Sequence, residues 1–384
     1  MDPQLRRRLT AVLLVLGVTF ISAGCSSESL KHFQRKVTVP ASVLRGVNVY
    51  SLEQNRAAGD PDAEVGEPES SYTYLAAQGV RVVRLAVPWG SLQPLAAGQD
   101  PHAALDEPLD KKYLAIVEKE VAKIARAGLS TVLDLHNGCG YPEGPSTPPA
   151  DEIYCGPGGI TLAQAERIWL RLSNAFRDDT SIAAYDLFNE PQPSKIKAQT
   201  YRQYTSVIVA ALRRNGDQHQ VWVESLLGQP ISDLAPDGGW IADPLHRVTY
   251  SSHFYPDFHL NAHYAAIPDR NRGSFLARIV DFGQWCQAAR VHCSIGELGW
   301  PGTDAQAVGT SAANFWNQVG NDAYNIADRY KLDVTYFGAS SVSPSALWAF
   351  GDGTAGEHGC PEVPSISICR SFSQASVIQA HSSG

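Results

Sequence analysis

The chain has 384 residues, a net charge of −8 at pH 7 and a hydrophobic content of 44%. An acidic chain does not suit the phosphate backbone of nucleic acids or anionic lipid headgroups, so we expect no nucleic-acid partner. A neutral substrate, which needs no electrostatic steering, is compatible with this composition.

The N-terminus carries the pattern of an export signal. Arginines at 6–8 precede a mainly apolar run over 9–21, and small residues follow directly before Cys25. This order is typical of a secretory signal, and the apolar run is too short to span a bilayer. Small residues before a cysteine resemble the bacterial lipoprotein signal, so we predict export by residues 1–25 and lipidation of Cys25. The protein would then lie on the extracellular face of the cell membrane; cleavage and secretion is the alternative.

Residues 26–43 are polar and lack clear periodicity, so we predict a tether there. The remainder, 44–384, has no low-complexity break or internal repeat, and its length is ordinary for one α/β barrel with insertions. Short apolar runs predict strands at 44–49, 80–87, 131–135, 182–188, 221–223, 248–252, 294–296 and 346–350.

Helical patterns lie between most of these runs, at 109–127, 161–176, 198–214 and 273–289. Alternation of strand and helix predicts a single catalytic domain with the (β/α)₈ TIM-barrel fold and loop insertions. A doubly wound open sheet is the alternative. No glycine-rich phosphate loop follows the first strand, which argues against a nucleotide-binding version of that sheet.

Six cysteines remain besides Cys25, and an even number in an exported protein predicts disulfides. Proximity in the sequence suggests three pairs, each closing a short loop: Cys139–Cys155, Cys286–Cys293 and Cys360–Cys369. No Cys-x-x-Cys pair occurs, which argues against a zinc site.

Two glutamates follow buried strands directly. The apolar run 182–188 ends in Asn189, Glu190 and Pro191, and the proline cannot continue a central strand. Glu297 has a similar setting, between two glycines at the end of the seventh predicted strand. The carboxyl ends of barrel strands share one cleft, so we expect these two carboxylates to lie there together.

Other polar and aromatic residues are predicted at the same ends of the strands. They are Arg84 on the second strand, Asp134 and His136 at the third, Asn189 at the fourth, His253 and Tyr255 at the sixth, and Trp348 on the eighth. In order and approximate spacing, this set with the two glutamates resembles glycoside hydrolase family 5, the cellulase family. The resemblance covers residues 44–350 and implies a (β/α)₈ barrel that hydrolyses β-glycosidic bonds with retention and without a cofactor or metal.

The resemblance implies a role for each matching residue. Glu190 corresponds to the acid and base and Glu297 to the nucleophile, with their carboxyl groups about 5–5.5 Å apart. Arg84 and Tyr255 would keep Glu297 ionised, whereas Glu190 should stay protonated in a less polar site. The remaining residues would bind the sugar: Asn189 its 2-hydroxyl, His136 and His253 other polar groups, and Trp348 a face of the ring. Apart from the resemblance, we predict Trp300 as a further stacking platform because it closely follows the nucleophile motif.

Several alternatives stay open. Glu224, at the end of the fifth strand, is either a sugar contact or a structural carboxylate. His259 and His263 have the spacing of a helical metal pair, but the local sequence is not clearly helical and we predict no metal site. A metal-dependent deacetylase could use Asp134 and the strand-end histidines. A barrel that binds glycans without catalysis is the non-enzymatic alternative.

The segments around strands three and four are most similar to those of endo-β-1,4-glucanases. A β-linked oligo- or polysaccharide is therefore the expected substrate. β-Mannanase, β-1,3-glucanase and glycolipid-cleaving activities are the alternatives within the family. We expect a monomer whose contact with the membrane is the lipid anchor.

Overall fold

The computed structural model describes residues 43–57, 66–136, 138–142, 152–256, 270–302, 310–342, 345, 347–353, 360 and 367–382. The predicted export signal, Cys25 and the predicted tether up to residue 42 lie outside the described residues, as do His259 and His263. None of the described helices combines the length and the apolar composition that a membrane span requires.

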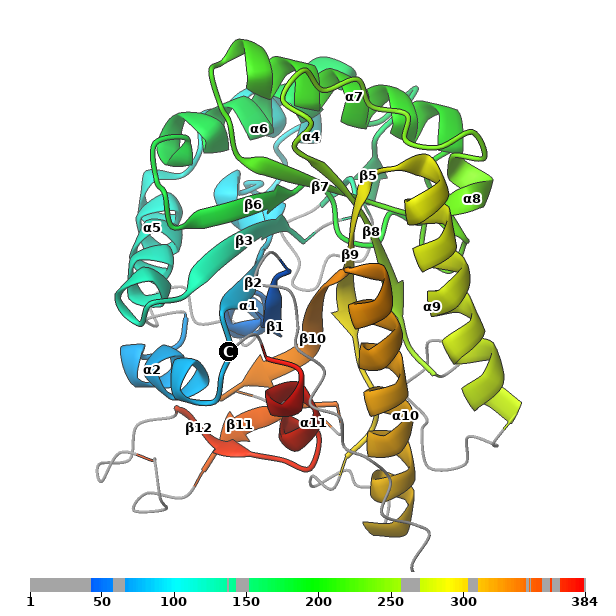
Figure 1. Ribbon diagram of the computed structural model, residues 1–384. Helices are drawn as coiled ribbons and strands as arrows, with labels where there is room; N and C mark the ends of the chain where they lie inside the picture. The colour runs from blue at the N-terminus through cyan, green and yellow to red at the C-terminus, as the bar shows by residue number, and fades with distance from the viewer. Residues whose placement is uncertain are drawn as a thin grey trace, which may run out of the picture. The chain divides into compact units, whose positions relative to one another are not determined.

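Eight parallel strands form a closed barrel (Figure 1). They are β1 (Arg45–Val49), β2 (Val82–Val87), β3 (Ser130–Leu135), β6 (Ile182–Asp186), β7 (Gln220–Glu224), β8 (Val248–Phe254), β9 (His292–Leu298) and β10 (Asp333–Ser340). Each pairs with the next, and β10 pairs with β1 to close the ring. The predicted (β/α)₈ barrel is confirmed, and the open sheet is excluded by the β1–β10 pairing.

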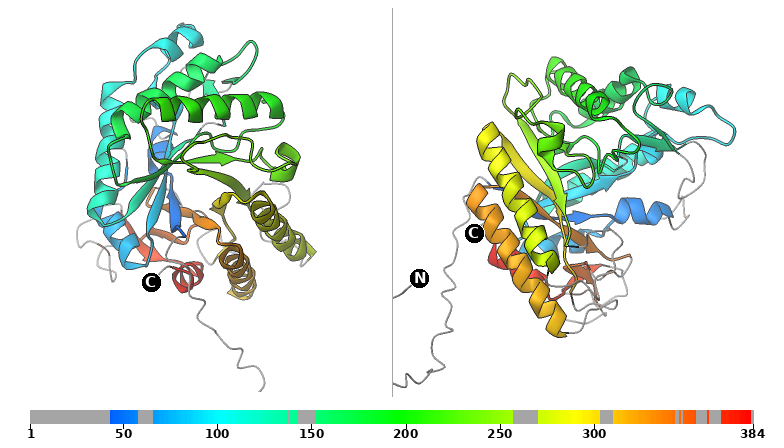
Figure 2. Two further views of the ribbon diagram at one scale, coloured as in Figure 1. Left: turned by 45° about the horizontal axis from the view of Figure 1, so that its top comes forward. Right: turned by 90° about the vertical axis from the view of Figure 1, so that its right-hand side faces the viewer.

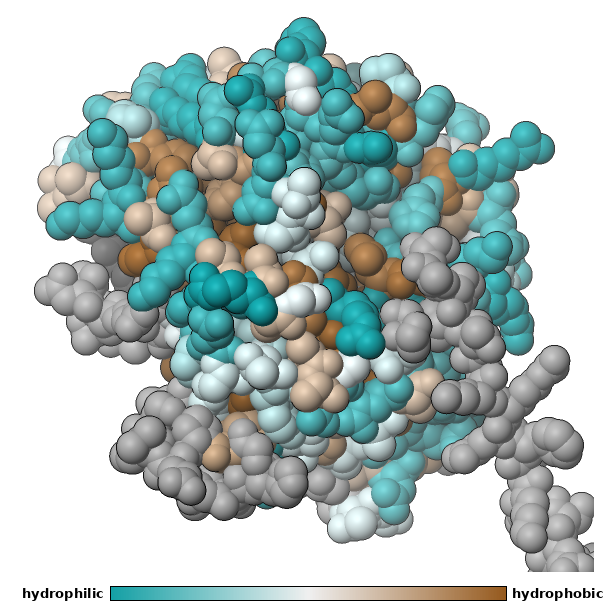
Figure 3. Space-filling view, turned by 60° about the vertical axis from the view of Figure 1, so that its left-hand side comes forward, coloured by the Kyte–Doolittle hydropathy of each residue, from teal (hydrophilic) through white to brown (hydrophobic). Residues whose placement is uncertain are grey.

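Helices cover the outside of the strands (Figure 2). The long ones are α5 (Lys111–Arg126), α6 (Leu162–Phe176), α7 (Ala198–Arg214), α9 (Arg270–Ala289) and α10 (Thr310–Tyr330). The first four match the predicted helices closely, and α10 was not predicted. Thr161 caps α6 in a capping box with Gln164, and Gly128 follows α5 at a left-handed φ of 78°. Hydrophilic residues cover much of the face shown in Figure 3.

Shorter elements decorate this framework. They are α1 (Ser51–Ala57), α2 (Glu69–Ala77), α3 (Trp89–Leu92), α4 (Pro101–Asp106), α8 (Ile231–Leu234), α11 (Ala375–Ala380) and the paired strands β4 (Gly140–Pro142) and β5 (Glu152–Tyr154). The connection after β7, which contains several prolines, forms only the single turn of α8. This agrees with the inability of proline to continue a helix.

The predicted eighth strand at 346–350 was wrong. The eighth barrel strand is β10, in which Asp333, Thr335 and Gly338 interrupt the apolar pattern. Both polar side chains are buried and hydrogen-bonded: Asp333 accepts from the Leu44 amide, and Thr335 donates to the Gly296 carbonyl. A short extension of the sheet follows it, formed by β11 (Phe350–Asp352) and β12 (Ile368–Ser371).

The three predicted disulfides are present. Cys139–Cys155 joins the two ends of the β4–β5 hairpin, and Cys286–Cys293 ties α9 to β9. Cys360–Cys369 fastens residue 360 to β12. Each bridge closes a short loop, as the spacing predicted.

The barrel interior is layered. Val82, Val132, Ala184 and Trp222 form a small buried cluster inside β2, β3, β6 and β7. Because side chains two positions apart share a face of a strand, the next interior positions belong to Arg84, Asp134, Asp186 and Glu224. These four residues, here called the charged layer, are all buried. An apolar floor therefore supports a charged layer near the carboxyl ends of the strands, where the candidate site lies.

Candidate active site

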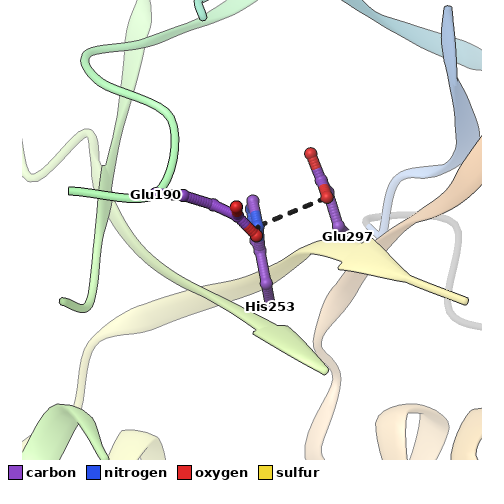
Figure 4. Close-up of side chains that lie close together, drawn as sticks. All are labelled: Glu190, His253 and Glu297. Carbon is purple, nitrogen blue, oxygen red and sulfur yellow. Dashed lines mark hydrogen bonds and ion pairs between the residues drawn. The ribbon is translucent and has the colours of Figure 1, made fainter. Parts of the chain in front are cut away.

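Glu190 and Glu297 approach each other beside His253 (Figure 4). Glu297 is part of β9, and Glu190 lies in the loop that follows β6. One oxygen of each carboxylate and one ring nitrogen of His253 all lie within 4.8 Å of one another. The structure thus brings together the two strand-end glutamates that the sequence singled out.

Glu297 is almost fully buried, with 3% of its surface exposed, and it is surrounded by donors. Its Oε1 accepts hydrogen bonds from the Tyr50 hydroxyl at 2.8 Å and from Arg84 Nη1 at 3.1 Å. Its Oε2 accepts one from the Tyr255 hydroxyl, and His253 Nδ1 lies 3.5 Å away. Both oxygens are therefore engaged by donors that suit a carboxylate anion rather than a metal ligand.

Tyr50 was missed by the sequence analysis although a signal existed. Asn48, on β1, points inward, because its amide bonds to the Gly296 carbonyl and its oxygen accepts from Arg84. Alternation along the strand places Tyr50, two positions later, on the same side. Its hydroxyl then reaches Glu297.

Glu190 is held through its backbone. Its φ of 50° is a left-handed value, and its amide donates to Glu224 Oε2 at 2.7 Å. Its side chain is 29% exposed and its Oε1 lies 3.0 Å from His253 Nδ1. The other ring nitrogen of His253 lies 3.0 Å from Glu224 Oε1. Glu224, for which two roles were open, thus contacts both the backbone of Glu190 and the ring beside it.

Arg84 is the centre of the charged layer. Its guanidinium lies within ion-pair distance of four buried carboxylates: Asp134 at 3.1 Å, Asp186 at 2.9 Å, Glu224 at 2.9 Å and Glu297 at 3.1 Å. It also donates to Asn189 Oδ1 at 2.9 Å. The expected contact between Arg84 and Glu297 is present, but Asp186 was not foreseen as a partner. A buried arginine can remain charged because carboxylates surround it.

His136 borders the same space. Its Nδ1 lies 2.6 Å from Asp134 Oδ2, and its Nε2 lies 3.3 Å from the amide nitrogen of Asn189. Its ring makes an edge contact with Tyr50, with the ring centroids 4.6 Å apart. Burial opposes a charge on the ring, but Asp134 outweighs it and raises the pKa of His136. The structure therefore places His136 and Asn189 together beside the two glutamates.

The electrostatics of the site differ from what we expected for the two glutamates. Burial alone raises the pKa of Glu190, but the hydrogen bond and charge of His253 outweigh it and lower the pKa. Burial raises the pKa of Glu297, the positive charge of His253 opposes this, and Glu190 adds to it. The pKa of His253 itself lies well above its usual range, because Glu224 and Glu297 outweigh the effect of burial. His253 thus favours its charged form next to Glu190, and the pKa shifts of the two glutamates run in the directions opposite to those expected.

The predicted aromatic platforms have different outcomes. Trp300 is fully buried, donates to Asn317 Oδ1 at 2.9 Å and packs edge-on against Tyr336, so its prediction as a sugar platform was wrong. Trp348 lies in the loop before β11, not on a barrel strand, and its ring contacts Phe337. Phe337 in turn contacts Tyr255, which places Trp348 near the nucleophile side of the site. Its stacking role stays a prediction.

The chain matches the family model of cellulase, glycosyl hydrolase family 5, over residues 47–343. Solved structures with this fold include endoglucanase Cel5A of Pseudomonas stutzeri, with 20% identity, a TM-score of 0.67 and coverage of 89% of this chain and 94% of that chain. The endo-β-1,4-glucanase Xac0029 of Xanthomonas axonopodis pv. citri has 19% identity, a TM-score of 0.65 and coverage of 89% and 99%. XacCel5A, in complex with cellopentaose, has 17% identity, a TM-score of 0.67 and coverage of 88% and 98%. At these identities the structures share the barrel fold.

Proposed function

Because the chain belongs to the cellulase family, glycosyl hydrolase family 5, and is a glycoside hydrolase, we propose that it hydrolyses β-1,4-linked glucans with retention of configuration. Glu190 acts as acid and base, and Glu297 acts as nucleophile. The separation of the two carboxylates carries this proposal. Their nearest oxygens lie within 4.8 Å of one another. Retaining enzymes have carboxyl groups about 5–5.5 Å apart, whereas inverting enzymes need about 6.5–9.5 Å to admit a water molecule.

The reaction proceeds in two steps. In the first, a Glu297 oxygen attacks the anomeric carbon, the bond to the leaving oxygen breaks, and that oxygen takes the proton of Glu190. In the second, Glu190 accepts a proton from water, and the resulting hydroxyl oxygen attacks the same carbon and releases Glu297. Two inversions give net retention.

The residues around Glu297 support its role as an anion. Arg84, Tyr50 and Tyr255 all donate to its oxygens, and hydrogen bonds to a carboxylate favour its charged form. Asn189, held by Arg84, stands beside the site and is proposed to bind the 2-hydroxyl of the sugar.

Glu190 must gain a proton before it can act as an acid. His253 Nδ1 lies 3.0 Å from Glu190 Oε1, a distance suited to direct proton transfer. A bound sugar excludes water, and exclusion of water favours the neutral pair of carboxylic acid and imidazole over the ion pair. We therefore infer that substrate binding moves the proton from His253 to Glu190.

The choice of β-1,4-glucans as substrate is supported by three similar solved structures. The similar structures from Pseudomonas and Xanthomonas are endoglucanases, and XacCel5A was crystallised with cellopentaose. Product analysis on β-1,4-glucans, β-1,3-glucans and β-mannans tests this choice. If only β-mannan is hydrolysed, the substrate is mannan and not glucan, and the mechanism with Glu190 and Glu297 is unaffected.

The catalytic roles are tested with Glu190→Gln and Glu297→Gln on a fluorogenic β-cellobioside. Removal of a general acid lowers turnover by about 10²–10⁴-fold, and we expect at least this loss for either variant. Glu118→Gln, an exposed glutamate on α5, is the matched control and should keep full activity. Proton NMR should show the β-anomer as the first product. Equal activity in the wild type and Glu297→Gln, or an α-anomer first, would reject the mechanism.

Export and anchoring are also proposed. The basic and apolar segments before Cys25 support a lipoprotein on the outer face of the cell membrane. Fractionation of the producing cells should place the wild type in the membrane, and Cys25→Ala should lose this anchor. Mass spectrometry of the N-terminal peptide should show a lipid on Cys25. An unmodified wild type in the medium would favour simple secretion. We further propose a monomer, which light scattering after size-exclusion chromatography checks.

A further inference from the structure

Glu67 is a buried carboxylate that has no part in the reaction described above. It lies in the connection between α1 and α2 and is fully buried. Its Oε1 accepts from the Ser51 hydroxyl and from the Ser341 amide at 3.0 Å, and its Oε2 accepts from the Ser71 hydroxyl at 2.9 Å. Burial of a carboxylate is costly unless hydrogen bonds satisfy it, and these three donors meet that condition.

Helix α5 fixes the backbone of Glu67. The Glu67 amide donates to Glu120 Oε1 at 2.7 Å, and the Glu67 carbonyl accepts from Lys123 Nζ at 2.7 Å. Glu120 and Lys123 pair with each other at 2.9 Å, and both are buried. Because α5 is one of the long helices around the barrel, Glu67 is attached to the framework of the fold.

The first donor to Glu67, Ser51, directly follows Tyr50, whose hydroxyl donates to Glu297 Oε1 at 2.8 Å. Ser51 begins α1, and the Tyr50 carbonyl accepts from two amides of the first turn of this helix. An isolated helix of seven residues is unstable in water, so contacts with the rest of the protein must set its orientation. The hydrogen bond from Ser51 to Glu67 is such a contact, at the residue next to Tyr50.

The second donor, the Ser341 amide, directly follows β10. Phe337 of this strand makes an edge contact with the Tyr50 ring, with the ring centroids 4.9 Å apart. Edge contacts between aromatic rings are favourable only in a narrow range of geometries. Glu67 therefore holds Tyr50 from two sides, through the chain at Ser51 and through the strand that makes the ring contact.

The position of Tyr50 affects the nucleophile. A hydrogen bond to a carboxylate favours its charged form, and this contribution is lost when donor and acceptor move apart. Burial, and then the charge of Glu297, raise the pKa of the Tyr50 hydroxyl well above its usual range, so the hydroxyl keeps its proton and remains a donor. A displacement of Tyr50 therefore disfavours the ionised form of Glu297.

We propose that Glu67 is a positioning residue for the nucleophile, which acts through Ser51 and Ser341 to fix the Tyr50 hydroxyl on Glu297. Glu67 takes no part in proton transfer or in the attack on the sugar, and its effect on the reaction passes through Tyr50. This inference rests on the proposed retaining hydrolysis, in which Glu297 attacks as an anion.

A double-mutant cycle with Glu67→Met and Tyr50→Phe tests the proposal on a soluble aryl β-cellobioside. Methionine is unbranched like glutamate and offers only a weak acceptor to the donors. Tyr50→Phe should lower kcat/KM by about tenfold or more, through loss of a hydrogen bond to a charged group, and Glu67→Met should lower it by part of this factor. Both should move the acidic limb of the kcat/KM profile to higher pH, because Glu297 then ionises less readily. In the Tyr50→Phe background, Glu67→Met should lower kcat/KM by less than about twofold.

Two serine variants follow the path of the effect. Ser51→Ala removes the donor next to Tyr50 and should also move the acidic limb to higher pH; it replaces Glu67→Met in the cycle if that variant does not fold. Ser71→Ala removes the donor from α2 to the other oxygen of Glu67, and as the matched control it should leave the limb in place. The position of the limb does not depend on the concentration of active enzyme, so partial misfolding does not imitate a shift.

The outcomes separate the two proposals. A wild type that hydrolyses neither cellopentaose nor the β-cellobioside would reject the proposed function and this inference with it. Activity that requires Glu297, with an acidic limb that Ser51→Ala leaves in place, would reject only the role of Glu67. Full additivity of Glu67→Met and Tyr50→Phe, or an equal shift of the limb in Ser71→Ala, would mean that Glu67 acts through general stability and would also reject that role.

Discussion

The variant Glu224→Gln tests which groups stabilise the proton shared by His253 and Glu190. Glu224 is 2% exposed and bridges the Glu190 amide, Arg84 and His253. The glutamine side chain has nearly the shape of the Glu224 side chain and lacks its negative charge. The substitution removes one of the carboxylates that raise the pKa of His253. Glu190 and Glu297 remain and still raise it. The proton shared by His253 and Glu190 should therefore leave at lower pH.

The magnitude follows from the 3.0 Å separation of His253 Nε2 and Glu224 Oε1. At about 4 Å and an effective dielectric constant of about 20, two unit charges interact by about 4 kcal/mol. Glutamine still offers an oxygen to the ring, so only part of this interaction is lost, and the shift is toward lower pH.

The assay is the pH dependence of kcat/KM on a soluble β-cellobioside. The basic limb of this profile reports the loss of the proton that Glu190 must donate. In the Glu224→Gln variant this limb should lie at lower pH than in the wild type. Asp217→Asn is the matched control, because it removes a buried carboxylate beside His219 at the other end of β7. Either variant can lower the free energy of unfolding by about 1–3 kcal/mol. A basic limb that stays in place, or moves to higher pH, would refute the reasoning.

Three further predictions concern stability. Trp300→Phe should lower the melting temperature and leave kcat of the folded enzyme unchanged, whereas a loss of kcat/KM alone would restore Trp300 as a sugar contact. Replacing Cys286 and Cys293 with alanine should reduce the free energy of unfolding in urea by about 2–4 kcal/mol; an unchanged midpoint would contradict this. Thr161→Ala should cost about 1 kcal/mol through loss of the capping box, with Thr161→Ser as the control that retains the cap.

Much of the fold could be predicted because buried strands and amphipathic helices leave strong periodic signals. Strand β10 could not, because Asp333 and Thr335 are polar in sequence yet buried by bonds to distant segments. No local pattern reveals such partners. The helix α10 was missed as well, and the strand that follows it was placed at 346–350 instead of 333–340.

The site could be predicted where strand-end residues stand next to proline or glycine, as Glu190 and Glu297 do. Alternation would have corrected one error: Glu297 points into the barrel, so Leu298 and Trp300 point outward into the helical layer. The same rule would have found Tyr50. The protonation states could not be predicted, because they depend on distances between side chains from different strands.

The charged layer explains why the protonation states of Glu190 and Glu297 could not be predicted from the sequence. The site and the layer hold five carboxyl groups, and Arg84 lies within ion-pair distance of four of them. Even with His136 and His253 protonated, five ionised carboxyl groups would outnumber these rings and Arg84, and repulsion between like charges opposes ionisation of all five. At Asp186, burial raises the pKa well above its usual range against the opposing charge of Arg84, and Oδ1 is buried without a hydrogen-bond partner among the described residues. The number of protons held by the whole cluster, and not the pKa of one residue, therefore sets the pH range of activity.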